Sequence, residues 1–191
     1  MRIEPTKPRY TIQQTAAGVT VAAPARRNWF VLLFLTVWLG GWTIGGMAAV
    51  AEVVRPGGHQ TFLAFWLLGW LIGELYALAI VLWQLTGREE LVFSSGNLIH
   101  RIRAGGMSRG REFSGAEIKH LRTSPQITSP WMDQSRWMPP VFGAGHGAIA
   151  FDYGAKTYRI GAGLDEAEGR LVLDEIRKHF PRMVDGAKSA T

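Results

Sequence analysis

The 191-residue sequence contains no cysteine, which excludes disulfide bonds and cysteine-ligated metal sites. It also lacks a Gly-x-Ser-x-Gly elbow, a His-Glu-x-x-His helix and a glycine-rich loop that ends in Gly-Lys-Ser/Thr. The five histidines show no metal-ligand spacing, and His100 fits a polar position in a strand. We therefore expect no enzymatic activity, no cofactor and no metal, and we name no catalytic residue.

Charged residues are almost absent from two long apolar runs, which cover residues 29–51 and 61–85. A helix needs about 20 apolar residues to cross a bilayer, and a buried helix of a soluble protein rarely stays uncharged for so long. The alternative, a hydrophobic core hairpin, is therefore disfavoured. We expect a transmembrane helical hairpin, with helices at about 29–53 and 61–86.

A cleaved signal peptide is a competing interpretation of the first run. Arg26 and Arg27 form a twin-arginine pair, and Ala49-Val50-Ala51 has the small-x-small form of a cleavage site. However, the run exceeds the length of a signal core, about 7 to 15 residues, and it follows a strand-like segment, residues 1–28. An uncleaved anchor is the preferred interpretation.

The distribution of basic residues predicts the orientation of this anchor. Five Lys and Arg precede the first run, one (Arg55) lies between the runs, and fifteen follow the second. Basic residues near membrane segments stay on the cytoplasmic side. We therefore expect a multi-pass protein of the bacterial inner membrane with both termini in the cytoplasm.

The net charge of +6 is then explained by the membrane rather than by nucleic acid, which we do not expect as a partner. Anionic lipid headgroups attract basic residues close to the surface. The candidates for this contact are Arg26, Arg27, Arg101 and Arg103. For the two arginines of the later strand, a solvated polar face is an equal alternative.

Small residues spaced four apart in both runs mark candidate helix contact faces, because they allow two backbones to approach closely. These residues are Gly41, Gly45, Gly69 and Gly73. They face each other within the hairpin or face a foreign helix. Four tryptophans also lie near the middle of the two runs: Trp38, Trp42, Trp66 and Trp70. They are either bulky side chains that face lipid or an aromatic surface that contacts a partner or a pigment.

Glu74 lies about midway along the second run, where an ionised carboxylate costs several kcal/mol. Neither run contains a Lys or Arg to pair with it, and Thr43, Tyr76 and Trp42 are the expected hydrogen-bond partners. Two interpretations stay open. Glu74 is either a proton-carrying or partner-binding carboxylate, or a protonated side chain that joins the two helices.

Short alternating segments on both sides of the hairpin predict an antiparallel sheet. The expected strands are 10–13, 19–21, 90–93, 97–103, 109–113, 117–123, 148–153 and 156–160. A lone hairpin is barely stable, so we expect the first two strands to join the sheet formed after residue 88. Asp165 and Glu168 predict a capping box that opens a last amphipathic helix, ended by Pro181.

This α+β pattern resembles bacterial membrane proteins that carry a pleckstrin-homology-like (PH-like) domain after a two-helix anchor. The resemblance rests on REELVF, GNLIHRIR, REFSGAEIKHLR and GAIAFDYGAKTYRIGAGLDEAEGRLVLDEIRKHFP within residues 88–181, and on PARRNWFVLLFL. It implies a curved antiparallel sheet or barrel closed by the C-terminal helix, followed by a flexible tail, residues 182–191. That fold has seven strands and six follow the anchor, so residues 10–21 supply a strand or the long loop hides one.

The long loop, residues 124–147, is apolar and aromatic, and loops of this length are usually functional or disordered. Its candidate docking residues, for a partner or for the bilayer, are Trp131, Met132, Trp137 and Met138. A flap folded on the sheet is the alternative.

These features together predict a non-enzymatic accessory, scaffold or assembly protein of the membrane. We expect it to contact lipids and other membrane proteins through the hairpin and the PH-like domain, in a homo- or hetero-oligomer. The alternative is an oligomeric transport or proton-coupled component that uses Glu74, since two helices alone are too few for a pathway.

Overall fold

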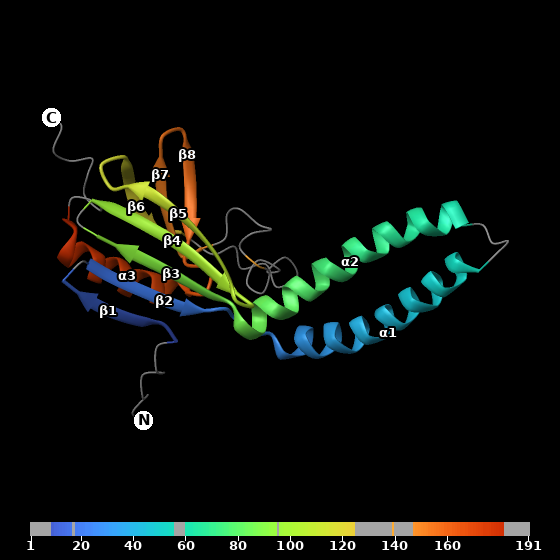
Figure 1. The fold of residues 1–191 in the computed structure, drawn as a ribbon. Helices are drawn as coiled ribbons and strands as arrows, with labels where there is room; N and C mark the ends of the chain where they lie inside the picture. The colour runs from blue at the N-terminus through green and yellow to red at the C-terminus, as the bar shows by residue number, and fades with distance from the viewer. Residues whose placement is uncertain are drawn as a thin grey trace, which may run out of the picture.

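The computed structural model describes residues 9–16, 18–55, 60–94, 96–124, 139 and 147–181. It is an α+β structure in which two long helices project side by side from a domain of antiparallel strands and one further helix (Figure 1). The predicted docking residues Trp131, Met132, Trp137 and Met138 and the tail, residues 182–191, lie outside the described residues.

The two apolar runs form helices α1 (Trp29–Val54) and α2 (Gln60–Thr86), whose bounds agree with the prediction to within one residue. At 1.5 Å per residue each is about 40 Å long, which exceeds the roughly 30 Å of a hydrocarbon core. Both helices are long and apolar enough to cross a membrane. Asn28 caps α1, because its side chain accepts hydrogen bonds from the backbone N–H groups of Phe30 and Val31.

The larger sheet contains five antiparallel strands in the order β1-β2-β3-β4-β5. Their bounds are β1 Thr11–Thr15, β2 Gly18–Pro24, β3 Arg88–Phe93, β4 Asn97–Ala104 and β5 Met107–Ser114. Strand β2 pairs with β3 from Val19 opposite Phe93 to Pro24 opposite Arg88. The prediction that the N-terminal strands join the later sheet is therefore confirmed, and the helical hairpin is inserted between two neighbouring strands.

The smaller sheet has the order β6-β7-β8, with β6 Ile118–Thr123, β7 Ile149–Tyr153 and β8 Lys156–Ile160. The pairing of β6 with β7 is interrupted between Lys119 and Arg122, where His120 has a positive φ of 51°. A bulge of this kind bends a strand and increases its twist.

The last helix, α3 (Glu166–His179), packs its apolar face on both sheets. Val172, Leu173 and Ile176 are buried as the helical spacing predicts, and Phe180 is partly buried beside them. The predicted capping box is present: Asp165 accepts from the backbone N–H of Glu168, whose carboxylate accepts from the N–H of Asp165. The core also contains Val19, Val21, Leu91, Phe93, Leu98, Phe113, Ile149, Phe151 and Ile160.

Candidate functional site

The two long helices contact each other through a row of indole rings. Trp42 of α1 stacks on Trp70 of α2 with ring centroids 3.8 Å apart. Trp38 and Trp66 extend the row at centroid distances of 4.1 Å and 4.5 Å from their neighbours. The indole N–H of Trp42 donates to the backbone oxygen of Trp70, 3.3 Å away. These tryptophans therefore fill the space between the helices.

The predicted glycines lie in two different environments. A Cβ added at Gly45 would lie 3.3 Å from the Trp70 ring, and one added at Gly73 would lie 3.5 Å from the Trp42 ring. The same test at Gly41 and Gly69 finds open space within 4 Å. The four glycines thus do not form one shared contact face. Two of them make room for an indole, and two leave the helix surface open.

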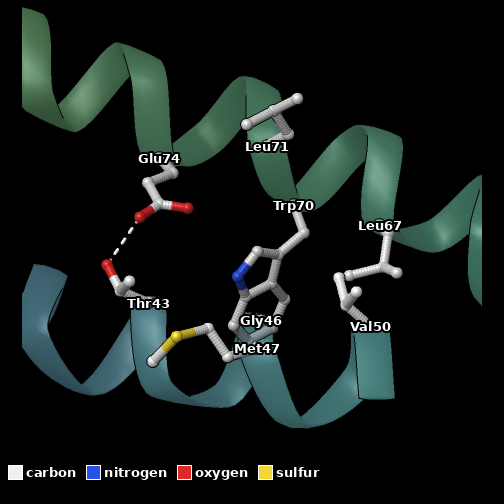
Figure 2. A pocket seen from close by; sticks show the side chains of 8 residues that line it. All are labelled: Thr43, Gly46, Met47, Val50, Leu67, Trp70, Leu71 and Glu74. Carbon is white, nitrogen blue, oxygen red and sulfur yellow. Dashed lines mark hydrogen bonds between the residues drawn. The ribbon is translucent and has the colours of Figure 1, made fainter. Parts of the chain in front are cut away.

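Glu74 lies near the middle of the hairpin, half-buried and facing α1 (Figure 2). The Thr43 hydroxyl donates a hydrogen bond of 2.5 Å to its Oε1, so one of the three expected partners is present. The N–H of Trp42, another expected partner, is bonded to Trp70 instead. The second carboxylate oxygen is directed along the groove toward the side where Trp70 lies (Figure 2).

A groove with a volume of about 390 Å³ runs beside this carboxylate. Its lining is mostly apolar and comes from both helices: Thr43, Gly46, Met47, Val50, Leu67, Trp70, Leu71 and Glu74 (Figure 2). The indole N–H of Trp70 is buried and has no hydrogen-bond partner among the described residues. Since Met47, Val50 and Leu71 are also exposed, the groove opens to whatever surrounds the hairpin. It offers a hydrogen-bond acceptor in apolar surroundings.

The base of the hairpin is joined to the sheet by polar contacts. The Arg27 guanidinium donates to the backbone oxygens of Gln84 (3.3 Å) and Leu85 (3.2 Å) in the last turn of α2. A cation at this position satisfies helix C-terminal carbonyls and interacts favourably with the helix dipole. The backbone N–H of Asn28 donates to Oε1 of the buried Gln84, 2.8 Å away. The Thr86 hydroxyl accepts from the N–H of Gly105, between β4 and β5.

The other arginines predicted to contact lipid also have protein partners. Arg26, whose side chain is only 15% exposed, pairs with Asp165 at the start of α3 at 3.7 Å. Arg101 and Arg103 both pair with Glu90 on the adjacent strand, at 3.6 Å and 3.4 Å. Contact with lipid headgroups would therefore compete with these ion pairs. The competition is weakest at Arg103, because its side chain is half exposed.

The sequence reasoning missed Glu89, a carboxylate only 2% exposed at the start of β3. It accepts hydrogen bonds from Gly161 N–H (2.8 Å) and Ala162 N–H (2.7 Å), and it lies 2.7 Å from Nε2 of His100. Burial raises its pKa, but the contacts with His100 and the two amides outweigh burial, so the pKa lies below the ordinary 4.5. The available signal was the alternation that places Glu89 on the same face as Leu91 and Phe93.

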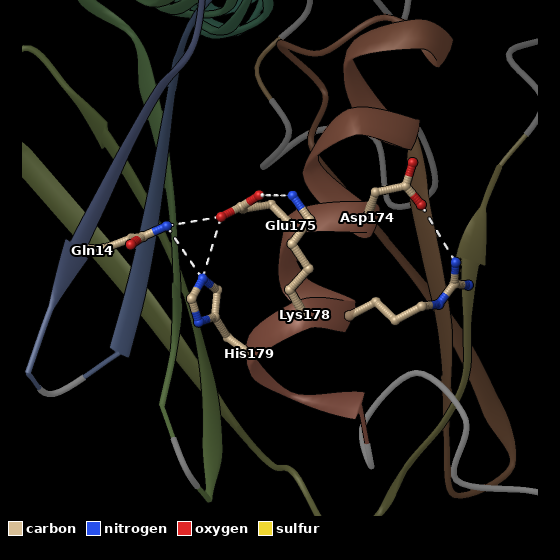
Figure 3. A network of polar contacts seen from close by, with 6 residues as sticks. Gln14, Asp174, Glu175, Lys178 and His179 are labelled. Carbon is tan, nitrogen blue, oxygen red and sulfur yellow. Dashed lines mark hydrogen bonds and ion pairs between the residues drawn. The ribbon is translucent and has the colours of Figure 1, made fainter.

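A second polar network ties the edge strand β1 to α3 (Figure 3). The Gln14 side-chain amide donates to Glu175 at 2.8 Å and lies 3.2 Å from Nε2 of His179. Glu175 also pairs with Lys178 at 2.9 Å, and this contact and the one with His179 lower its pKa. These exposed contacts position β1 against α3.

Among the described residues, no cluster of three or more His, Cys, Asp or Glu could hold a metal ion. Comparisons with protein-family models, with curated proteins and with solved structures find no match. The groove beside Glu74 is the candidate functional site, because it combines a polar group, an apolar lining and access from outside.

Proposed function

We propose that this chain is a non-enzymatic integral membrane protein of the bacterial inner membrane, which acts as an accessory, scaffold or assembly factor for other membrane proteins. The observation that carries the proposal is the exposure of the hairpin. Apart from Met107 and Leu171, every large apolar side chain that is exposed among the described residues belongs to α1 or α2. Apolar surface of this extent needs lipid or another protein to cover it.

Burial within the two helices supports a membrane location over a soluble core. In the most apolar windows of α1 and α2, only 11% and 17% of the residues are buried inside the structure. A core helix of a soluble protein would be mostly buried. A signal sequence is disfavoured for α1, because Trp42 and Gly45 of α1 pack against α2 along its length.

The pairing of β2 with β3 supports an orientation with both flanks of the hairpin on one side. These strands precede and follow the two helices, and they are hydrogen-bonded to each other. The excess of Lys and Arg outside the short connection between the helices favours the cytoplasm as that side.

The strand count supports a PH-like domain. Strands β2 to β8 number seven, as the resemblance implies, once the strand before the hairpin is added to the six after it. The helix α3 follows the last strand and packs on the core, as a closing helix would. Strand β1 is then an additional edge strand.

The hairpin offers surfaces for partner helices. Gly41 and Gly69 leave the helix surface open, and the groove beside Glu74 contains the one carboxylate at mid-length. Small residues and polar side chains are the two features that favour helix association in a membrane. A proton-coupled role for Glu74 is less well supported, because helix residues 29–54 and 60–86 contain no chain of ionisable groups that could relay a proton.

Co-purification in mild detergent tests the function. A membrane protein recovered in fixed ratio with the chain should be lost or reduced with Gly41→Leu, Gly69→Leu or Glu74→Leu. Lys119→Ala, an exposed change in β6, is the matched control and should retain the partner. Recovery of this chain alone from its native membrane, at every detergent used, would contradict the proposal.

The orientation has its own test, which uses the absence of native cysteine. Single cysteines at Thr11, Arg55 and Lys119 are labelled with a membrane-impermeant maleimide in intact cells and in inverted vesicles. Thr11→Cys and Lys119→Cys should react from the cytoplasmic side only, and Arg55→Cys from the opposite side only. Labelling of Thr11→Cys and Lys119→Cys from opposite sides would contradict a spanning hairpin.

A further inference from the structure

The carboxylate of Glu74 has an incomplete set of partners for a site inside a membrane. An ionised carboxylate accepts hydrogen bonds at two oxygens, and among the described residues the Thr43 hydroxyl donates to Oε1. Intramembrane acids are costly and are normally paired. Glu74 lies 14 residues after the start of α2 and 12 before its end, so neither end of the helix brings it near water.

The hairpin itself contains no cation for Glu74. Residues 29–54 and 60–86 include no Lys, Arg or His. Arg27 is bonded to Leu85, 11 residues along α2 from Glu74, and Arg55 follows Thr43 by 12 residues. At 1.5 Å per residue these distances are about 16 to 18 Å. Both arginines are therefore beyond the reach of a direct ion pair.

We propose that the groove beside Glu74 receives a lysine or arginine side chain from the transmembrane helix of another protein. Charge complementarity decides the occupant, since the group in the groove that can carry a charge is the carboxylate of Glu74, and the indole N–H of Trp70 is a neutral donor. The proposal rests on the membrane-accessory function above and specifies the chemistry of the partner. A second copy of the chain fits poorly, because it would bring another Glu74 and no cation.

The lining of the groove suits a long basic side chain. Met47, Val50, Leu67 and Leu71 supply apolar surface for an aliphatic stem, and Glu74 lies at the end of the groove next to Thr43 (Figure 2). Lys and Arg bury such stems while keeping the charged group at a polar partner. The volume of about 390 Å³ is sufficient for one such side chain. Thr43 fixes the carboxylate by occupying one of its oxygens.

Synthetic transmembrane peptides test the proposal directly. The full chain, labelled at one introduced cysteine, is reconstituted in phosphatidylcholine vesicles with acceptor-labelled Leu/Ala peptides of about 20 apolar residues. The peptides differ only at the central position, which is Lys, Arg, Leu or Glu. We expect energy transfer to show the Lys and Arg peptides binding about five- to tenfold more tightly than the Leu peptide, the scale of one polar helix contact.

Two variants make the result specific. Glu74→Gln should bring the Lys and Leu peptides to within about twofold of each other, and Glu74→Lys should reverse the preference toward the Glu peptide. Glu52→Gln is the matched control, because Glu52 is the other carboxylate of α1 and α2 and pairs with Arg55 at 3.1 Å. It should leave the preference unchanged. Circular dichroism and monodispersity establish that each variant is folded.

Three outcomes would overturn the inference. Equal binding of all peptides indicates helix association without charge recognition, which leaves the accessory function intact. Absence of binding by every peptide would rule out a lysine or arginine side chain as the occupant of the groove. The co-purification experiment would still test the accessory function separately. Self-association of the chain that is lost with Glu74→Gln assigns the groove to a second copy.

Discussion

Nε2 of His100 lies 2.7 Å from Oε1 of Glu89, whose side chain is buried between the larger sheet and the segment that leads from β8 to α3. Because Glu89 also accepts the N–H groups of Gly161 and Ala162, it joins β3 and β4 to that segment. An anionic group is thus an internal connector of the domain, close to where α2 enters the sheet.

Replacing Glu89 should destabilise the domain strongly. Glu89→Ala leaves the buried N–H of Gly161, the partly buried N–H of Ala162 and the ring of His100 without their acceptor, which should cost about 3–5 kcal/mol of unfolding free energy. Chemical denaturation of the full chain in micelles measures this. Glu112→Ala, which removes an exposed carboxylate on β5 that bonds Asn97, should change the stability by less than about 0.5 kcal/mol. Equal effects of the two changes would contradict the connector role.

The lowered pKa of Glu89 predicts an acid dependence of stability. Its folded pKa lies below the ordinary 4.5, so the unfolded chain binds more protons as the pH falls below that value. The stabilisation is therefore complete above about pH 4.5 and is lost as the pH falls through the folded pKa. Melting temperature measured against pH should fall less steeply below about pH 4.5 in Glu89→Gln than in the unchanged chain.

Asp152 predicts a second acid dependence of stability. Hydrogen bonds from Thr157 and Arg122 lower the pKa of Asp152 to about 2. The stabilisation by Asp152 is therefore present above its ordinary pKa of 3.8 and is lost as the pH falls toward 2, so Asp152→Asn should alter the curve only below about pH 3.8. A change above about pH 4.5 in this variant, or an unchanged slope in Glu89→Gln, would be inconsistent with these assignments.

Gly18 is required where β1 turns into β2. Its φ is +148°, and an added Cβ would overlap the carbonyl oxygen of Phe93 on β3. Gly18→Ala should therefore disturb the pairing of β2 with β3 and cost at least about 2 kcal/mol. The measurement is the denaturation midpoint together with amide exchange in β2 and β3. Gly96→Ala meets open space and is the control, and similar losses in both variants would argue against a specific contact.

Arg27 should govern the angle between the hairpin and the sheet. Arg27→Met removes both hydrogen bonds to the end of α2, and Arg27→Lys keeps the charge without the two-pronged contact. Spin labels at Val54→Cys and Leu171→Cys, both exposed, report the distance between the far end of α1 and α3. We expect a broader distance distribution with Met than with Lys. Unchanged distance distributions in both variants would indicate that the contact between Gln84 and Asn28, and not Arg27, fixes the angle between the hairpin and the sheet.

The sequence was sufficient to predict every described helix and strand, because apolar runs, alternation and the Asp165 capping box are local signals. It also placed Thr43 among the three expected partners of Glu74, since both lie at mid-length of antiparallel helices, but it did not distinguish Thr43 from Trp42, which bonds Trp70 instead. The partners of the glycines were not predictable in the same way. Spacing identifies a helix face, but it does not reveal that Trp70 lies opposite Gly45.

Contacts distant in sequence account for the remaining differences. Arg27 meets the oxygen of Gln84 57 residues away, and Glu89 meets Gly161 72 residues away. No local pattern encodes such pairs. The burial of Glu89 was also hidden by an expected strand start at residue 90, two residues later than the observed start at Arg88, which removed Glu89 from the alternating set.

The insertion of the hairpin between β2 and β3 has a consequence for biogenesis. During synthesis β2 emerges before α1, and its neighbour β3 emerges only after α2. If only one of the two helices inserted across a bilayer, β2 and β3 would lie on opposite sides of it and could not pair. If the hairpin spans a membrane as proposed, the sheet can therefore be completed only in a chain in which both helices have crossed.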